Sequence, residues 1–540
     1  MNLLGSAIRC SNWHPLGSSR HSLRLGLCFG VALLSACTPN EDGKLGKEGD
    51  LQTVLITNVS VVDGSGEPSF TGDVRLQDKL IVGLGDLEQS DNDQLVDGRG
   101  LVLAPGFIDT HSHHDSGIEQ SPESIAAISQ GITTIVVGND GGSGHTMAEL
   151  AQLMTRKPPT INVASYTGHG SIRSMVLGED YRREATPIEI DKMQALLVDE
   201  LRGGSLGLST GLEYDPGIYS NTTEVIALAK AAAAEGGRYI SHMRSEDRAF
   251  DSALEELLQI GRETGMPVQI SHFKLASTEL WGRASRVLQR LDQARRDGID
   301  VTADIYPYTF WQSTLTVLLP ERDFYDLDAA RYALEMLAPA QGLTLVNYAP
   351  DPKLVGMTVA QIAKARGLSN EETYLQLIRD AYEGVNAQQL DEGDLEEVPE
   401  MVMGESMSED DIATLLAWPH SNLCSDGYGE GHPRGHGAFP RAIRQYVREQ
   451  KILTIEQMIH KMTGLAAAHM GFTDRGLIKP GYAADLVLFD PETITDKATI
   501  SSPQQISDGI AGVWVNGARV WRNQQVTAAR PGKLLIRAGQ

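Results

Sequence analysis

The middle of the chain alternates between two hydrophobic periodicities. Short apolar runs rich in β-branched residues end in glycine or polar residues, and amphipathic helical patterns separate them, several ending at glycine. The eight runs are LAPGFIDTHSH, GITTIVVGND, INVASYTGHG, SLGLSTGLEY, RYISHMRS, PVQISHFK, DVTADIYPY and SNLCSDG. Eight strand–helix units predict an α/β fold of the TIM-type (β/α)8 barrel class.

Both ends of the chain show a different pattern. Residues 51–103 read as short alternating strands with Asp-Gly turns, and residues 478–540 return to the same style. We expect them to build one small discontinuous β-sandwich around a barrel at residues 104–477. The interval before the last barrel strand is too long for one helix, so an inserted subdomain is expected near residues 321–400.

The first fifty residues predict export. Residues 25–36 are apolar, too short to span a bilayer and of the length of a signal-peptide core. The segment LLSAC resembles a bacterial lipobox, so removal of residues 1–36 would leave Cys37 as the lipidated residue; an ordinary secretory signal or a buried helix is the alternative. Residues 37–50 would be a flexible tether. Thr38 after the cysteine favours the outer membrane, with the protein lipid-anchored on the periplasmic side of the cell envelope.

Composition and charge narrow the function classes. The 540 residues are 41% hydrophobic and 22% charged, which is an ordinary composition for a globular protein. A chain of this length can bury a large hydrophobic core. A net charge of -25 repels phosphate backbones, so nucleic acid is not an expected partner. Four cysteines exclude a disulfide scaffold and a cysteine-rich zinc module, and Cys424 is interpreted as a core residue.

Candidate metal ligands stand at the ends of the predicted strands, where barrel enzymes gather their catalytic groups. His111 and His113 share a face because strand side chains alternate, while His242 and His272 follow nearly identical apolar runs. Asp140 ends the second run. Solvent-facing histidines or strand caps are the alternative, but imidazole and carboxylate ligands together suit zinc, and we expect one or two divalent ions per chain.

Asp426, in SNLCSDG, is the candidate catalytic residue. A carboxylate at this strand end can take a proton from a metal-activated water and pass it to a leaving amine, although an Asp-Gly turn is the plain alternative. The barrel pattern carries neither a phosphate-binding loop nor a dinucleotide fingerprint, which argues against kinases and dehydrogenases.

Taken together, these strings resemble the amidohydrolase superfamily: PGFIDTHSH, the strand-end histidines, SDG and GLIKPGYAADLVLFDP. Within it the chain is similar to the N-acyl-D-amino-acid deacylases, or D-aminoacylases, in GITTIVVGNDG, TGHGSIR, GLSTGLEYDPGIYS, YISHMRSE, QISHFK, DIYPYT and HPRGHGAFPR. The resemblance runs from about residue 51 to the end. It implies a metal-dependent barrel with a β-sandwich, and hydrolysis of small N-acyl-D-amino acids to a carboxylate and a D-amino acid.

The resemblance also implies roles for the ligands. One metal would be held by His111 and His113, and the other by His242 and His272. The family usually has a cysteine ligand where this chain has Asp140, so a harder carboxylate replaces a thiolate and the identity and number of metals are open.

The substrate needs partners of its own. By resemblance Asp426 acts as general base and then acid, while Lys274, Tyr306 and Arg434 bind the substrate carboxylate, which is costly to bury unpaired. The stretch TFWQSTLTVLLP offers aromatic and aliphatic lining without an early cation, which favours neutral or apolar D-side chains over acidic ones.

Two other functions stay open. One is another amidohydrolase that cleaves cyclic amides or peptides, hydantoinase-like or dipeptidase-like. The other is a non-catalytic envelope lipoprotein that binds or scaffolds, which the replacement of the metal cysteine by Asp140 keeps in view. In each case a lipid anchor would make the membrane a partner.

Overall fold

The computed structural model describes residues 53–115, 117–383, 398–428 and 431–537. The predicted signal peptide, Cys37 and the tether lie outside these residues. Among the described helices, none has the length and apolar character needed to cross a membrane.

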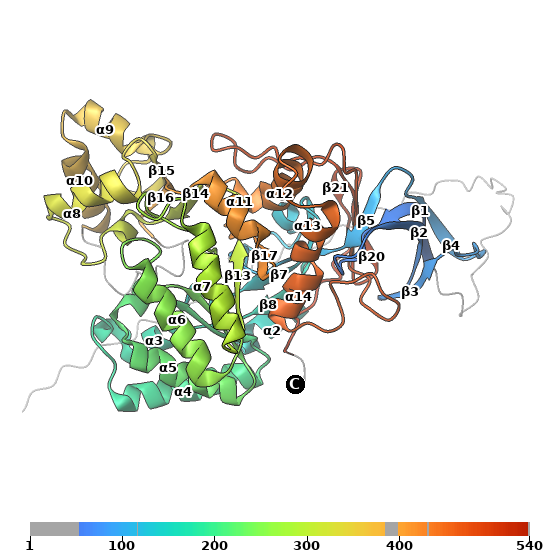
Figure 1. Cartoon of the computed structure of the whole chain (residues 1–540), viewed down its shortest axis with the longest axis horizontal. Coiled ribbons are helices and arrows are strands. Elements are labelled where there is room, and N and C mark those ends of the chain that lie inside the picture. Colours follow the sequence, from blue (N-terminus) through green and yellow to red (C-terminus); the bar gives the residue numbers. More distant parts are fainter. Residues whose placement is uncertain (1–52, 116, 384–397, 429–430, 538–540) are drawn as a thin grey trace, which may run out of the picture. The chain divides into compact units, whose positions relative to one another are not determined.

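A barrel of parallel strands forms the centre of the molecule (Figure 1). Its strands are β6 (Phe107–Asp109), β7 (Ile132–Val137), β8 (Asn162–Ser165), the short β9 (Thr167–Gly168), β10 (Gly207–Gly211), β11 (Arg238–His242), β12 (Val268–Ile270), β13 (Val301–Ile305) and β17 (Ser421–Leu423). A parallel bridge between Ser112 and Gly427 joins the first strand to the last. The strands are buried almost throughout, as in sheets covered on both faces, and the predicted TIM-type barrel is confirmed.

Helices cover the barrel, and α3 to α6 lie side by side along it (Figure 1). The helices outside the insertion are α1 (Ile125–Ile128), α2 (Met147–Arg156), α3 (His169–Leu177), α4 (Pro187–Arg202), α5 (Thr222–Ala234), α6 (Phe250–Thr264), α7 (Ala284–Arg296), α11 (Glu409–Ala417), α12 (Arg434–Ala442), α13 (Ile455–Met462) and α14 (Gly464–Met470). Local sequence sets their ends: Thr186 and Glu189 form a capping box before α4, and Gly265 ends α6 in the left-handed region.

A nine-stranded sheet combines both ends of the described chain, blue and red in Figure 1. Its strands are β1 (Thr53–Val61), β2 (Phe70–Gln77), β3 (Leu80–Gly85), β4 (Asp93–Asp97), β5 (Val102–Pro105), β18 (Leu486–Phe489), β19 (Ile510–Val515), β20 (Ala518–Arg522) and β21 (Gln525–Val526). The join is antiparallel, with Leu486 opposite Pro105. Ile56, Val74 and Trp514 are buried in a core of its own, so the two ends form one unit.

An insertion separates β13 from β17. It contains the antiparallel strands β14 (Phe310–Ser313), β15 (Leu343–Tyr348) and β16 (Glu400–Glu405), and the helices α8 (Leu327–Tyr332), α9 (Val359–Arg366) and α10 (Asn370–Tyr382). Because it leaves and re-enters the barrel beyond the carboxyl ends of the strands, β14 and the 3₁₀ turn Leu315–Leu318 reach the cavity at that end.

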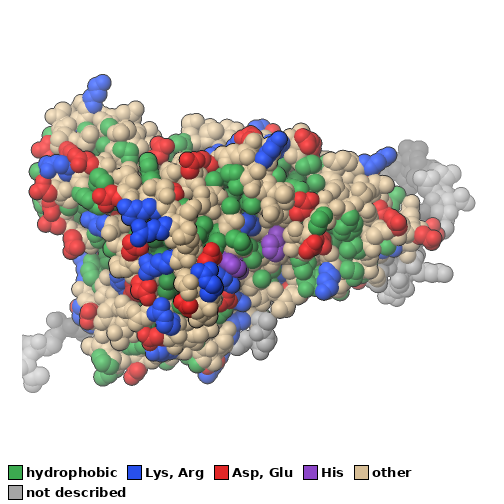
Figure 2. Space-filling view, in the orientation of Figure 1, with side chains coloured by type: hydrophobic (Ala, Val, Ile, Leu, Met, Phe, Trp, Pro, Cys, Tyr) green, Lys and Arg blue, Asp and Glu red, His purple; other side chains and the backbone are tan. Residues whose placement is uncertain are grey.

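The surface mixes its charges. On the face in Figure 2, acidic and basic side chains lie next to one another among apolar ones. Surface ion pairs such as Arg290–Glu255, at 2.8 Å, link neighbouring helices. Exposed pairs of this kind contribute at most about 1 kcal/mol each, so they add little to the stability of the fold.

Candidate metal centre and active site

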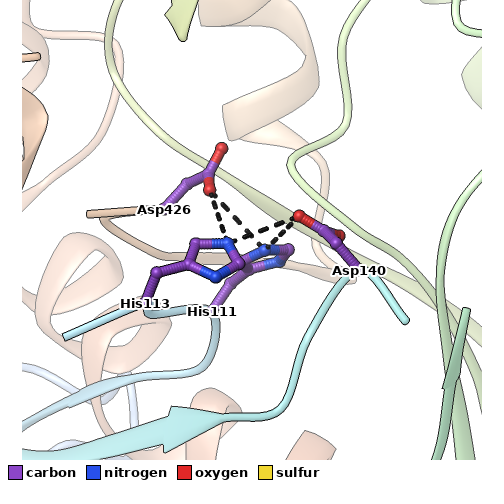
Figure 3. Close-up of side chains that lie close together, drawn as sticks. All are labelled: His111, His113, Asp140 and Asp426. Atoms are coloured by element: carbon purple, nitrogen blue, oxygen red, sulfur yellow. Dashed lines mark hydrogen bonds and ion pairs between the residues drawn. The ribbon is translucent and has the colours of Figure 1, made fainter. Parts of the chain in front are cut away.

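Four histidines and two aspartates converge at the carboxyl ends of the barrel strands. His111 and His113 follow β6, Asp140 follows β7, and Asp426 follows β17. Figure 3 shows the side chains of these four pointing toward one another. His242 and His272 are contributed by β11 and the loop after β12.

The first cluster is formed by His111, His113, Asp140 and Asp426, whose ligand atoms all lie within 4.8 Å of one another. Asp140 Oδ2 lies 3.1 Å from His111 Nε2 and 3.4 Å from His113 Nε2. Asp426 Oδ1 lies 3.6 Å and 3.4 Å from the same two nitrogens. Two imidazoles and two carboxylates thus face one point, which is the arrangement that holds a divalent cation.

Asp140 belongs to a second cluster, with His242 and His272. Its other oxygen, Oδ1, lies 3.3 Å from His272 Nε2, and His242 Nδ1 lies 3.0 Å from the same nitrogen. One carboxylate therefore faces both clusters, one oxygen toward each. With this geometry, Asp140 could serve both clusters as a ligand, at the position where the family that the sequence resembles usually has a cysteine.

Backbone strain marks the same residues. Asp140, His272 and Asp426 adopt left-handed backbone angles, with φ of 52°, 34° and 49°. A non-glycine residue in such a conformation costs about 1–3 kcal/mol and persists only where surrounding contacts enforce it. The strand ends are bent so that these side chains turn into the barrel mouth.

Asp304, on β13, positions two of the histidines. Its Oδ1 lies 3.4 Å from His111 Nδ1 and accepts the backbone N–H of His272 at 2.6 Å. Carboxylates behind metal-binding histidines fix the ring orientation and make the ring a better ligand. Cys424 is buried and donates its thiol to the same oxygen at 3.2 Å.

Arg434 faces Asp426 from the start of α12. The two side chains are buried, and Arg434 Nη1 lies 2.6 Å from Asp426 Oδ2. Burial alone would raise the pKa of Asp426, but Arg434 and His111 hold it well below its ordinary value. Asp426 is therefore an ionised carboxylate with one oxygen toward the histidines and one toward a fixed guanidinium.

Lys274 and Tyr306 lie on the neighbouring wall. Lys274 Nζ donates to Glu246 Oε2 at 2.6 Å and lies 2.7 Å from His272 Nδ1. Burial opposes ionisation of Glu246, yet Lys274 lowers the pKa of that carboxyl to about 2. The Tyr306 ring lies beneath Arg434, 4.6 Å from the guanidinium carbon to the ring centroid. All three predicted substrate-binding residues therefore border the same cavity as the clustered histidines.

Several buried polar atoms here have no hydrogen-bond partner among the described residues. They include Asp140 Oδ1 in the second cluster, and the Tyr306 hydroxyl and Arg434 Nε beside it. Buried polar atoms are normally satisfied, so these await groups from outside the chain. A cation fits between the carboxylates and imidazoles, and an anionic group fits Tyr306 and Arg434.

Sequence reasoning missed four acidic side chains of the site. Glu213 follows β10, Glu246 and Asp247 follow β11, and Asp304 lies on β13. Glu213 Oε2 lies 2.8 Å from His242 Nε2, and with Glu246 these two form a third group able to hold a cation. The strings GLEY, HMRSED and TADIY place these acids at the ends of predicted strands. The same position identified the histidines as candidates and could have identified these acids.

Comparison with known proteins gives a family match over most of the chain. A model of the amidohydrolase family matches residues 94–521. An N-acyl-D-aspartate deacylase of Alcaligenes xylosoxydans xylosoxydans is 35% identical, and the match covers 89% of this chain and 94% of that protein. A D-aminoacylase of the same organism is 33% identical, with 90% and 97% covered.

Solved structures agree with this match. A crystal structure of a D-aminoacylase superposes with a TM-score of 0.79 at 32% identity, covering 90% of this chain and 99% of that one. An N-acyl-D-glutamate deacylase of Bordetella bronchiseptica, solved with zinc and a phosphonate inhibitor, superposes with a TM-score of 0.77 at 33% identity, covering 90% and 100%. A binuclear metal centre is described for D-aminoacylase.

Proposed function

The chain belongs to the amidohydrolase family, within its D-aminoacylase group, and from that premise we propose that it hydrolyses the amide bond of N-acyl-D-amino acids. The products are a carboxylate and a free D-amino acid. The observation that carries the proposal is the convergence of imidazoles and carboxylates at the barrel mouth, beside unpartnered groups suited to an anionic substrate.

Zinc is the expected metal. Two groups would hold it: His111, His113, Asp140 and Asp426 in one, and Asp140, His242 and His272 in the other. When bound there, zinc supplies a Lewis acid that polarises a carbonyl oxygen and a water molecule. Imidazole nitrogens with carboxylate oxygens are a ligand set that zinc accepts.

Asp426 manages the proton. Arg434 and His111 hold its pKa well below the ordinary value, so the carboxylate is ionised and has an oxygen to accept a proton. The attacking water would be acidic enough to give that proton once it is polarised by bound zinc. The same group then returns that proton to the nitrogen of the leaving D-amino acid. Arg434, 2.6 Å from Oδ2, fixes the carboxylate through both transfers.

Tyr306, Arg434 and Lys274 bind the substrate carboxylate. The Tyr306 hydroxyl and Arg434 Nε are buried and have no hydrogen-bond partner within the described part of the chain. Arginine presents a planar fork that suits a carboxylate, and Lys274 adds a nearby cation. Anchoring this end places the amide carbonyl over the clustered histidines.

The test is a substrate screen with the zinc-loaded protein. N-acetyl-D-methionine is expected to be hydrolysed and its L-enantiomer and hydantoins are not. Turnover of the L-form or of a hydantoin alone would instead support a dipeptidase-like or hydantoinase-like enzyme. A protein that shows no turnover and binds less than about one metal per chain after reconstitution would support a scaffold.

We further propose that the enzyme is a lipoprotein on the periplasmic side of the cell envelope, in the outer membrane. The apolar residues 25–36, the LLSAC box and the polar residues 37–50 support this address. Cys37 would carry the lipid, because it follows the small residues at the predicted cleavage site.

Labelling of growing cells with radioactive palmitate tests the anchor. The wild-type protein is expected to take up label and to sediment with membranes, whereas Cys37→Ser does neither. Cys424→Ser is the matched control, because Cys424 is buried in the barrel, and this variant keeps both properties. Label retained by Cys37→Ser would contradict the anchor.

A further inference from the structure

Two carboxyl groups line the cavity without a role in the proposed hydrolysis. Glu213 and Asp247 follow adjacent strands, β10 and β11, and are only 7% and 8% exposed. Both border the space that the substrate would fill above the histidines. Any role for them in binding rests on the proposed function, since it concerns the substrate of that same site.

Each of these carboxyl groups leaves one oxygen to the cavity. Asp247 Oδ1 accepts the Ser245 hydroxyl at 2.6 Å and the backbone N–H of Arg248, and Glu213 Oε2 contacts His242. Within the described residues, Asp247 Oδ2 and Glu213 Oε1 accept no hydrogen bond. A buried carboxylate without a partner is costly, and two side by side repel each other.

The nearby cations among the described residues have partners of their own. Arg322 donates to the backbone carbonyl of Glu213 at 3.2 Å and pairs with Asp215, also at 3.2 Å. Lys274 pairs with Glu246, 2.6 Å away. The Arg248 guanidinium donates to the carbonyl of Leu318 at 3.0 Å and lies over the Tyr332 ring, 4.8 Å from its centroid. The positive charge that would balance these two acids is therefore expected from the substrate.

An aliphatic wall leads to the acids. Ala276, Val317 and Leu318 line the same cavity. Arg248, the residue after Asp247, donates a hydrogen bond to the carbonyl of Leu318, which holds this wall next to Asp247. A chain of methylenes ending in an ammonium group matches such a surface, because the stem packs on carbon and the head meets oxygen.

We propose that Glu213 and Asp247 form a subsite for a primary ammonium group of the substrate. That group has two possible sources. It is either the side-chain ammonium of a basic D-residue such as D-lysine, or the terminal ammonium of an aminoacyl group, which would make the substrate a dipeptide with a D-residue at its carboxyl end.

Two substrate pairs on the zinc-loaded enzyme test the proposal. Nα-acetyl-D-lysine is compared with N-acetyl-D-norleucine, and L-alanyl-D-alanine with N-acetyl-D-alanine. In one pair the charged member is expected to exceed the neutral one in kcat/KM by about tenfold, the effect of one hydrogen bond to a charged group. The pair that shows this preference identifies the source of the ammonium.

Variants locate the preference. Asp247→Asn is expected to lower the charged-to-neutral ratio of the preferred pair by about tenfold. Asp251→Asn, four residues along and with its side chain 82% exposed, is the matched control and keeps the ratio. Neutral substrates at least equal to charged ones in both pairs, or N-acetyl-D-glutamate preferred over all, would overturn the subsite while leaving the deacylase intact. No turnover of any substrate would overturn the deacylase, and this subsite with it.

Discussion

The two ends of the barrel differ in whether their buried charged side chains are fully paired within the chain. At the amino end, Asp485 accepts the Asn162 side chain at 3.1 Å and Arg475 on one oxygen, and the backbone N–H of Asn516 at 2.6 Å on the other. Both carboxylate oxygens are used, and the partners come from the barrel and the nine-stranded sheet. This cluster is closed by the chain itself.

The carboxyl end is left open. Asp140 Oδ1, the Tyr306 hydroxyl and Arg434 Nε are buried without hydrogen-bond partners among the described residues. Asp140 and Asp426 also adopt strained left-handed angles, with φ of 52° and 49°. At the amino end of the barrel, buried carboxylates paired within the chain stabilise the fold. At the carboxyl end, similar side chains keep atoms unpaired within the described chain, which suits the binding of metal and substrate.

Asp426→Asn breaks the open end most strongly. Because the amide cannot accept the proton, kcat for N-acetyl-D-methionine is expected to fall about a thousandfold, within the range of general acid–base catalysis. The variant also leaves the buried Arg434 without its charged partner and removes a charged oxygen from the group that would hold zinc, so the thermal midpoint of unfolding and the zinc affinity are expected to fall as well. The rate constant kcat is therefore measured on folded, zinc-saturated protein. Full activity in this variant would mean that another group is the base.

Asp485→Ala breaks the closed end. It leaves Arg475, whose side chain is 6% exposed, without its buried partner, and is expected to cost about 3 kcal/mol of unfolding free energy. Asp474→Ala removes the other, 65% exposed partner of Arg475 and should cost below about 1 kcal/mol. Urea unfolding measures both. The loss in kcat/KM of the folded variant can be expressed as a free energy and compared with the loss in unfolding free energy. A larger catalytic loss would contradict a purely structural role for Asp485.

Asp140→Ala sharpens the comparison, because Asp140 faces both clusters. Zinc affinity is expected to fall about a hundredfold or more, since loss of a supporting outer-sphere partner alone costs about 10–100-fold. Asp140→Cys, which restores the residue usual in the resembling family, keeps a ligand and should keep metal. Metal analysis after dialysis decides between them, and unchanged zinc in the alanine variant would show that Asp140 is not a ligand.

The barrel could be predicted from sequence because its signal is local and repeated. Each apolar run ends in polar residues, so the runs could be counted as strands. The same pattern predicted that His242 and His272 lie at the same level along the barrel axis, at the carboxyl ends of their strands. The order of pairing is then the chain order, as it is in parallel barrels.

Side-chain pairing across strands could not be predicted in this way. Asp304 contacts His111 only because closure of the barrel brings β13 near β6. Glu213 contacts His242 from the neighbouring strand β10, but the backbone after that strand decides which atoms meet. Nor does periodicity report that Asp140 would turn one oxygen to each cluster, since this depends on its φ of 52°. Local pattern places residues at an edge, while tertiary geometry decides which atoms meet.

Lys461 provides the smallest and most selective test of the closed end. It lies on α13, buried, and donates to the carbonyls of Trp418 and Ser421 at 2.5 Å and 2.9 Å. Burial lowers its pKa from 10.5 to about 7, so between these values the unfolded chain holds a proton that the folded chain lacks. Raising the pH through this window therefore stabilises the fold, by at most about 1.4 kcal/mol per pH unit.

The difference in unfolding free energy between wild type and Lys461→Met should accordingly rise from pH 7 to pH 9 (window set by the pKa of about 7). Lys192→Met, at an exposed position on α4, is the control for loss of a lysine charge. A difference that falls as the pH rises would mean that the carbonyls of Trp418 and Ser421 hold the ammonium form more strongly than burial opposes it. The amino end would then also depend on a charge, but one that the chain itself fully partners.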